Sequence, residues 1–277
     1  MVSILKKSLF LGRMITSNFR MDPSFIIIGG RGCGTTSLFN YLIEHPCILS
    51  PLQKEIHFFH HKFFKGLSWY KGFFPKKGST ILFNDEKILP ITGEASADYI
   101  HHPLAPKRIS EVLPNVKLIV LLRNPVDRAY SDYQKAVSGG SEDLTFEESL
   151  EYEDQRINGE IEKIMSDENY YSFNFWHHAY LYQSRYAHQL KNWFSYFDRN
   201  KILIIKSEDM FSNPAKVVQQ VFSFLDLPNF PKISYKKYNV GNYSDLSHIT
   251  RQKLFEYFKP YNEELSKLTG QDFSWNK

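Results

Sequence analysis

"IIIGGRGCGTTS", residues 26–37, joins a short apolar run to a loop of glycine and hydroxyl residues. The apolar run begins near residue 24 and reads as a buried parallel strand, whereas "TSLFNYLIEH" (36–45) has apolar residues at helical spacing before Pro46. A glycine-rich loop between a strand and a helix turns backbone N–H groups and the positive end of the helix dipole toward an anion. The stretch therefore predicts a phosphate-type site, with a plain strand-to-helix turn as the other interpretation.

The spacing of this loop is close to that of ATP-binding loops, G-x-x-x-x-G-K-[ST]. Gly29 and Gly34 fit that pattern, but Thr35 stands where the lysine would reach a β- or γ-phosphate. A second apolar strand, 115–125, contains Arg123 near its end and no metal-binding aspartate there. These two departures favour a phosphate ligand bound without magnesium over a nucleotide-hydrolysing site.

The strand-then-helix pattern recurs along the 277-residue chain. We expect a strand in 115–125 before a helix over 126–137, and a strand in 201–210 before a helix over 213–227; each helix starts at Asn-Pro. A long helix is expected over 175–197, and two helical stretches parted by Pro260 over 248–270. Alternating strands and helices predict one α/β domain over 24–277, a three-layer α/β/α arrangement around a mainly parallel sheet, after an N-terminal extension, 1–23.

Composition narrows the functional classes. A net charge of +4 is a mild bias toward anionic ligands, and no nucleic-acid-binding motif accompanies it. Cys33 and Cys47 are the only cysteines, so we expect no disulfide framework and a reducing, cytoplasmic location. The apolar runs of residues 1–20 are too short to span a bilayer, which leaves a plain extension or a surface-binding helix. No histidine group has metal-ligand spacing, so no metal site is expected.

Arg123 and Ser131 suggest a second phosphate position. Arg123 lies at the carboxyl end of a predicted strand, where ligands of open α/β sheets bind, and Ser131 lies about two turns into the next helix. An arginine fork with a serine hydroxyl suits a phosphate. The alternative is an ion pair between Arg123 and Asp127 or another carboxylate.

Four ordered segments resemble the sulfotransferases that use 3′-phosphoadenosine 5′-phosphosulfate (PAPS), in the branch of bacterial carbohydrate sulfotransferases and heparan sulfate sulfotransferase domains. They are the loop, "PLQKEIHFF" (51–59), "LLRNPVDRAYSDY" (121–133) and the tail after residue 238. The resemblance implies the P-loop-like sulfotransferase fold, PAPS as donor, adenosine 3′,5′-bisphosphate (PAP) as product and a glycan hydroxyl as acceptor. It places the 5′-phosphosulfate on Gly30, Arg31, Gly32, Cys33, Gly34, Thr35, Thr36 and Ser37, and the 3′-phosphate on Arg123 and Ser131.

The same resemblance makes Glu55, in K-E-x-H-F-F, the general base, with His57 two residues on. A carboxylate against a sugar hydroxyl removes its proton as the oxygen attacks sulfur. The family usually has a cation at the position of Gly32, so we hypothesise that Arg31 supplies that charge; Lys54 or His57 is the alternative.

Further positions follow from the resemblance. Trp69, in the aromatic stretch 58–74, and Tyr186, in 175–188, would flank the acceptor and the adenine, although both segments also suit core packing. Residues 236–247 would form a lid over PAPS or a solvated loop, and Ala95 argues mildly against a heparan-like acceptor. A PAPS-dependent sulfotransferase is thus the first interpretation, with a nucleotide or sugar kinase and a non-catalytic PAPS-binding module as alternatives.

Overall fold

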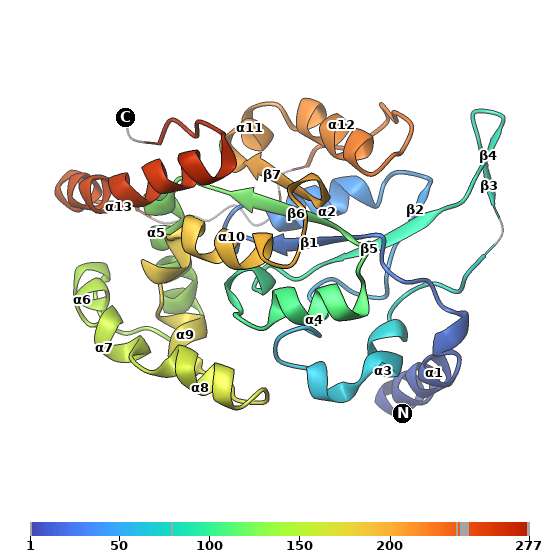
Figure 1. Ribbon diagram of the computed structural model, residues 1–277, viewed down its shortest axis with the longest axis horizontal. Helices are drawn as coiled ribbons and strands as arrows, with labels where there is room; N and C mark the ends of the chain where they lie inside the picture. The colour runs from blue at the N-terminus through green and yellow to red at the C-terminus, as the bar shows by residue number, and fades with distance from the viewer. Residues whose placement is uncertain (1, 79, 237, 239–243, 276–277) are drawn as a thin grey trace.

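A five-stranded parallel sheet forms the centre of the molecule (Figure 1). The computed structural model describes residues 2–78, 80–236, 238 and 244–275. The strands stand in the order β2 (Ile48–Leu49), β5 (Ile91–Ala95), β1 (Phe25–Gly29), β6 (Lys117–Leu122) and β7 (Ile202–Lys206). Every neighbouring pair in this sheet is parallel, as the sequence predicted. A separate antiparallel hairpin, β3 (Ile81–Phe83) and β4 (Glu86–Ile88), projects from the body.

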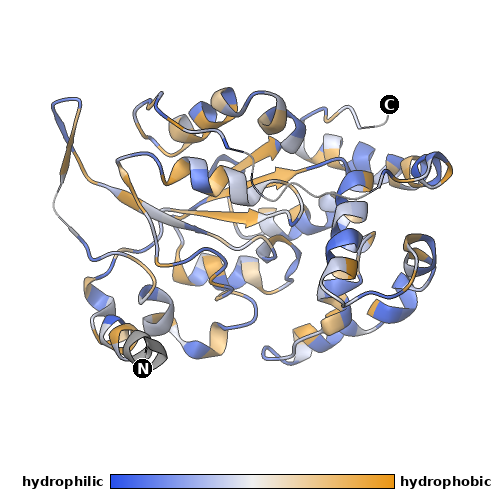
Figure 2. Cartoon of the chain, turned by 180° about the vertical axis from the view of Figure 1, so that it is seen from behind, coloured by the Kyte–Doolittle hydropathy of each residue, from blue (hydrophilic) through white to orange (hydrophobic). Residues whose placement is uncertain are grey.

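Helices cover both faces of the sheet because side chains alternate along each strand. Phe25 and Ile27 pack toward α2 (Thr35–Leu42) and α12 (Pro214–Phe224), with α11 (Ser207–Ser212) on the same side. Ile26 and Ile28 face the opposite way, toward α4 (Ala105–Val112) and α10 (Tyr186–Phe194). The apolar strands lie between amphipathic helices (Figure 2), so the predicted three-layer α/β/α architecture is confirmed.

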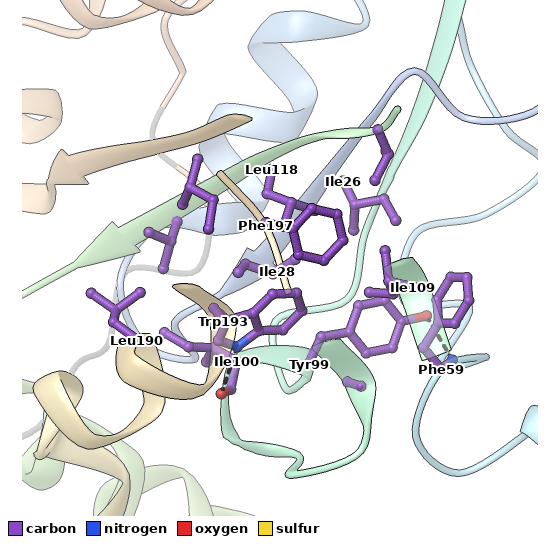
Figure 3. Packing of buried hydrophobic residues seen from close by; sticks show 14 of the residues in the cluster. Ile26, Ile28, Phe59, Tyr99, Ile100, Ile109, Leu118, Leu190, Trp193 and Phe197 are labelled. Carbon is purple, nitrogen blue, oxygen red and sulfur yellow. Dashed lines mark hydrogen bonds between the residues drawn. The ribbon is translucent and has the colours of Figure 1, made fainter. Parts of the chain in front are cut away.

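Aromatic rings fill the layer between the sheet and α10 (Figure 3). Trp193 is fully buried near Ile28 and Leu118, and its indole N–H donates to the carbonyl of Ile100 at 3.1 Å. Most rings of the 58–74 stretch belong to the same core; Phe58, Phe59, Tyr70, Phe73 and Phe74 are all buried. Core packing is therefore the role of these five residues.

Six further helices of the described chain lie beyond the carboxyl ends of β1 and β6 (Figure 1). They are α5 (Pro125–Ser138), α6 (Phe146–Glu151), α7 (Glu153–Ile157), α8 (Glu160–Ser166), α9 (Phe173–His177) and α13 (His248–Thr269). The predicted starts of α5 and α12 are confirmed, since Asn124 accepts from the Val126 N–H and Asn213 from the Lys216 N–H.

Two predicted helices differ from the structure. The single helix over 175–197 is wrong, because α9 ends at His177 and α10 begins at Tyr186. Between them the backbone N–H groups of Leu181 and Tyr182 donate to the buried carboxylate of Glu153, each at 2.7 Å. The break predicted at Pro260 is also wrong, since α13 runs through it. Pro260 is exposed, so water can satisfy the carbonyl left without its helical donor.

The N-terminal extension forms a helix, α1 (Val2–Ile15), that packs against α3 (Leu67–Lys71). Arg13 donates to the carbonyls of Gly72 at 2.6 Å and Phe74 at 2.7 Å, and Arg20 also reaches the Phe74 carbonyl at 3.0 Å. The rings of Phe10 and Phe73 are 4.7 Å apart. Among the described residues, no helix combines the length and apolar character needed to cross a bilayer.

Candidate functional site

The glycine-rich loop lies between β1 and α2, at the carboxyl end of the sheet. The Gly30 N–H donates to the Leu121 carbonyl at 2.7 Å, and Ser207 Oγ donates to the Cys33 carbonyl at 2.8 Å. Gly34 caps α2 with φ of +93°, where a Cβ atom would stand 2.5 Å from Met210 Cε. Only glycine fits this position without displacing Met210, because both the conformation and the space exclude a side chain.

The two predicted phosphate positions meet at Gly32. Arg123 Nη1 donates to the Gly32 carbonyl at 3.3 Å. Ser131 Oγ would lie 3.7 Å from a Cβ placed on Gly32, so the serine of α5 stands directly beside the loop. Thr35 and Ser37 are buried and Thr36 is half-buried at the start of α2. The structure thus brings together the loop, Arg123 and Ser131 around one helix N-terminus.

Arg31 faces two aspartates. Its Nε donates to Asp132 Oδ1 at 2.8 Å and its Nη2 to the Trp176 carbonyl at 2.7 Å, while Nη1 is 3.8 Å from Asp98 Oδ1. Asp132 also accepts from Arg128, whose side chain is fully buried. Burial opposes ionisation of Asp132, but the charges of Arg31 and Arg128 outweigh it and lower the pKa of this carboxyl to about 2.

Glu55 stands on a tight turn beside the carboxyl end of β5. Its carboxylate accepts from the Ala97 N–H at 3.1 Å and contacts Lys54, and its backbone N–H donates to the Ala95 carbonyl at 2.9 Å. Glu55 and His57 have φ of +57° and +61°, a left-handed conformation that costs free energy for residues with side chains. A conformation of this kind persists only where the surroundings fix it.

Glu94 of β5 provides much of that fixation. The fully buried carboxylate accepts hydrogen bonds from Tyr70 at 2.7 Å, Ser96 at 2.9 Å and Tyr99 at 3.2 Å. Ser96 Oγ in turn accepts from the His57 N–H at 3.1 Å, and the Tyr99 hydroxyl accepts from the N–H groups of Phe58 at 2.9 Å and Phe59 at 3.3 Å. One buried carboxylate therefore orients the hydroxyls that hold the turn after Glu55.

Glu94 makes stability depend on pH. Burial raises its pKa to about 7, against the three hydroxyl donors that lower it, so the folded state keeps a proton that the unfolded state loses above about pH 4.5. We expect the free energy of unfolding to fall by up to about 3 kcal/mol as pH rises from 4.5 to 7, and then to level off. Urea unfolding at several pH values, for the wild type and Glu94→Gln, measures this effect.

The comparison of these two proteins isolates Glu94. Burial also raises the pKa of Glu153 to about 7, but that group is common to both proteins and cancels in the difference. Parallel stability curves for the wild type and Glu94→Gln between pH 5 and 8 would contradict the role given to Glu94.

His57 lies between this turn and the aspartates. Burial lowers the pKa of its imidazole, although the nearby charges of Asp98 and Glu55 act to raise it. Its Nδ1 is 3.2 Å from Nε2 of His60. His57 therefore stands next to Glu55 as a largely neutral ring.

Several predicted residues pack against other parts of the protein. Tyr186 is 1% exposed, and its hydroxyl donates to the Arg123 carbonyl at 2.8 Å, so it supports the end of β6 rather than lining the site. Cys33 is fully buried beneath the loop. Trp69 packs on Phe10 and Phe73 beside α1. Of the predicted lid, 236–247, residues 237 and 239–243 lie outside the described residues.

Comparisons with known proteins match this arrangement. The family model described as "Sulfotransferase domain" matches residues 22–267. The sulfotransferase from Alicyclobacillus acidocaldarius, whose crystal structure is known, is 27% identical to this chain and superposes on it with a TM-score of 0.72. The match covers 92% of this chain and 99% of that one.

Eukaryotic relatives are similar at comparable identity. Membrane-associated sulfotransferase kil1 of Dictyostelium discoideum is 28% identical over 91% of this chain and 66% of its own length. Heparan sulfate glucosamine 3-O-sulfotransferase 3B1 of Mus musculus is 29% identical over 92% of this chain and 65% of its own length. The chain thus spans slightly less than two thirds of these two relatives.

Proposed function

Because this chain belongs to the sulfotransferase domain family and is a transferase of that class, we propose that it moves a sulfuryl group from PAPS to a saccharide hydroxyl. The observation that carries the proposal is the approach of Arg123 and Ser131 to the glycine-rich loop at Gly32, which supports two adjoining anion-binding positions. PAPS carries a phosphosulfate at one end of its ribose and a phosphate at another, so it requires two such positions. The loop from Gly30 to Ser37 would hold the first, and Arg123 with Ser131 the second.

Transfer would occur in line between the acceptor oxygen and the sulfur. Glu55 takes the proton of the acceptor hydroxyl as its oxygen bonds to sulfur, and the bond from sulfur to the bridging oxygen breaks. PAP leaves with that electron pair. The backbone N–H groups of the loop and the N-terminus of α2 stabilise the charge that develops on the departing phosphate oxygen.

Arg31 remains our candidate for the cation that Gly32 lacks. Its Nε and Nη2 donate to protein oxygens, whereas Nη1 makes, among the described residues, only the long ion pair with Asp98. Nη1 would therefore donate to the bridging oxygen without breaking the contact with Asp132. Retention of full turnover in Arg31→Ala, with loss in Lys54→Ala, would transfer the role to Lys54.

A saccharide acceptor is supported by the similarity to heparan sulfate sulfotransferases and by Glu55, the proposed base for a sugar hydroxyl. Ala95, the position that argued against a heparan-like acceptor, is fully buried and pairs with Ile27 across the sheet. Its side chain therefore makes no contact with an acceptor. Transfer of radiolabelled sulfate to a panel of saccharides, phenols and alcohols tests the acceptor class, and transfer to phenols alone would refute a saccharide acceptor.

The donor half of the proposal is tested by calorimetry with PAP in EDTA. We expect one site on the wild type, and an affinity about 10- to 100-fold lower in Arg123→Met, because a charge-assisted hydrogen bond contributes about 1.5–3 kcal/mol. Arg251→Met is the matched control, since Arg251 pairs with Asp127 near the surface. Binding of ATP with magnesium, but not of PAP, would favour the kinase alternative.

A further inference from the structure

Two histidines and an aspartate converge beside the Glu55 turn. One nitrogen each from His57 and His60 and a carboxylate oxygen of Asp98 all lie within 4.8 Å of one another. The histidines belong to the segment after β2, whereas Asp98 follows β5. Residue spacing along the chain does not reveal this group, because the carboxylate comes from a different segment.

The spacing suits a small divalent ion. Zinc binds imidazole nitrogens at about 2.0–2.1 Å, so two nitrogens at a tetrahedral angle stand roughly 3.3 Å apart. Nδ1 of His57 and Nε2 of His60 are 3.2 Å apart. Rotation of the half-buried Asp98 side chain would bring its oxygen inward to complete three ligands. A fourth position would be left for water, as in sites with two histidines and one carboxylate.

Two buried polar atoms of this group lack a hydrogen-bond partner. Asp98 Oδ1 is buried and has no hydrogen-bond partner within the part of the chain that the structure describes, although Arg31 Nη1 forms an ion pair with it at 3.8 Å. His60 Nδ1 is also buried without a partner there, whereas His60 Nε2, the nitrogen near His57, is within hydrogen-bond distance of His57 Nδ1. Buried polar atoms normally have partners, and an unsatisfied one indicates a missing ligand or strain. His60 is 2% exposed and is held by the rings of His61, Tyr99 and Trp176, with centroids at 3.8, 5.1 and 5.4 Å.

We propose that His57, His60 and Asp98 bind a divalent transition metal ion, for which Zn²⁺ is the probe. Two imidazoles with one carboxylate are the donors that zinc prefers, whereas magnesium prefers oxygen ligands alone. Arg31 Nη1 is 3.8 Å from Asp98 Oδ1, whereas its Nε lies closer to Asp132, at 2.8 Å. The contact between Arg31 and Asp98 is therefore the weaker of the two, which leaves Asp98 able to act as a ligand.

The ion would regulate the transferase, a consequence that rests on the proposed function. A metal on His57 places a positive charge near the Glu55 carboxylate, which already interacts electrostatically with His57. That charge would stabilise the ionised carboxylate, so Glu55 would be a weaker base toward the acceptor hydroxyl. Zinc therefore inhibits transfer without displacing PAP, because the loop and Arg123 do not take part in binding it.

Zinc titration of the full chain tests the site directly. The protein is first dialysed against EDTA to strip bound metal, and the EDTA is then dialysed away. Competition with a chromophoric chelator should show one Zn²⁺ per chain in the wild type and no competition by Mg²⁺. His60→Phe, which keeps an aromatic ring in the cluster, and Asp98→Asn should each weaken binding at least about tenfold. Thermal unfolding confirms that each variant is folded.

His61→Phe is the matched control, because the His61 ring packs against His60 but lies outside the three-residue group. It should bind zinc like the wild type. Wild-type affinity in both His60→Phe and Asp98→Asn, or the absence of stoichiometric zinc in the wild type, would overturn the site. PAP calorimetry on the same samples keeps the two proposals separate, since failure to bind PAP refutes the donor assignment and leaves the zinc result standing.

Discussion

Replacement of Glu55 by glutamine is expected to lower kcat for sulfuryl transfer by about 10²- to 10⁴-fold and to leave PAP affinity unchanged. The amide oxygen of glutamine can still accept from the Ala97 N–H, which keeps the turn in place. The amide cannot take the proton of an acceptor hydroxyl. Steady-state transfer of radiolabelled sulfate gives kcat, and calorimetry gives the PAP affinity.

Lys54→Met is the matched variant for this experiment. It removes the same contact between Lys54 and Glu55 but leaves the carboxylate in place. An equal loss of kcat in both variants would mean that the ion pair or the cation matters more than the base. Full turnover of Glu55→Gln would rule out Glu55 as the general base.

Replacement of Asp132 by alanine should lower the free energy of unfolding by about 3–5 kcal/mol, because it leaves the buried Arg128 and the half-buried Arg31 without their shared carboxylate. Asp127→Ala is the control on the same helix, since Asp127 and Arg251 are each about a third exposed. Its loss should be at most about 1 kcal/mol, as is usual for surface ion pairs. Urea unfolding at pH 7 measures both, and equal losses would contradict the buried network.

Acid unfolding provides a second test that distinguishes Asp132→Ala from Asp127→Ala. The folded pKa of Asp132 is about 2, below its value in the unfolded chain of about 4. Its stabilisation is therefore complete above about pH 4 and is lost as pH falls toward 2. Asp132→Ala should lack this component of acid unfolding, whereas Asp127→Ala should keep it.

The sequence predicted the strands that are apolar throughout. Strands β1, β6 and β7 lie inside the predicted segments; β1 and β6 are buried almost throughout, and β7, at the edge of the sheet, is partly buried. Strand β5 was missed because Gly93 and Glu94 interrupt its apolar pattern, and β2 because it has only two residues. The buried carboxyl group of Glu94 is accommodated inside the sheet because three hydroxyls from the surrounding fold bind it.

In the candidate site, too, some contacts could be predicted from the sequence and others could not. The approach of Arg123 and Ser131 to the loop could be predicted, because adjacent parallel strands end at the same edge of the sheet. The partners of Arg31 could not, since Asp98 and Asp132 come from separate segments and only the tertiary packing brings them together. Likewise, aromatic spacing alone did not distinguish a supporting Tyr186 from a ligand contact.

The tethering of the Glu55 turn bears on how an acceptor would be selected. The amides of Glu55, His57, Phe58 and Phe59 are all hydrogen-bonded to fixed groups of β5 and the residues after it. Such a segment is already ordered before any acceptor arrives, so no binding energy is consumed in shaping it. A preorganised base of this kind discriminates by fit, and a hydroxyl held an ångström away from the carboxylate reacts slowly even when its sugar is bound.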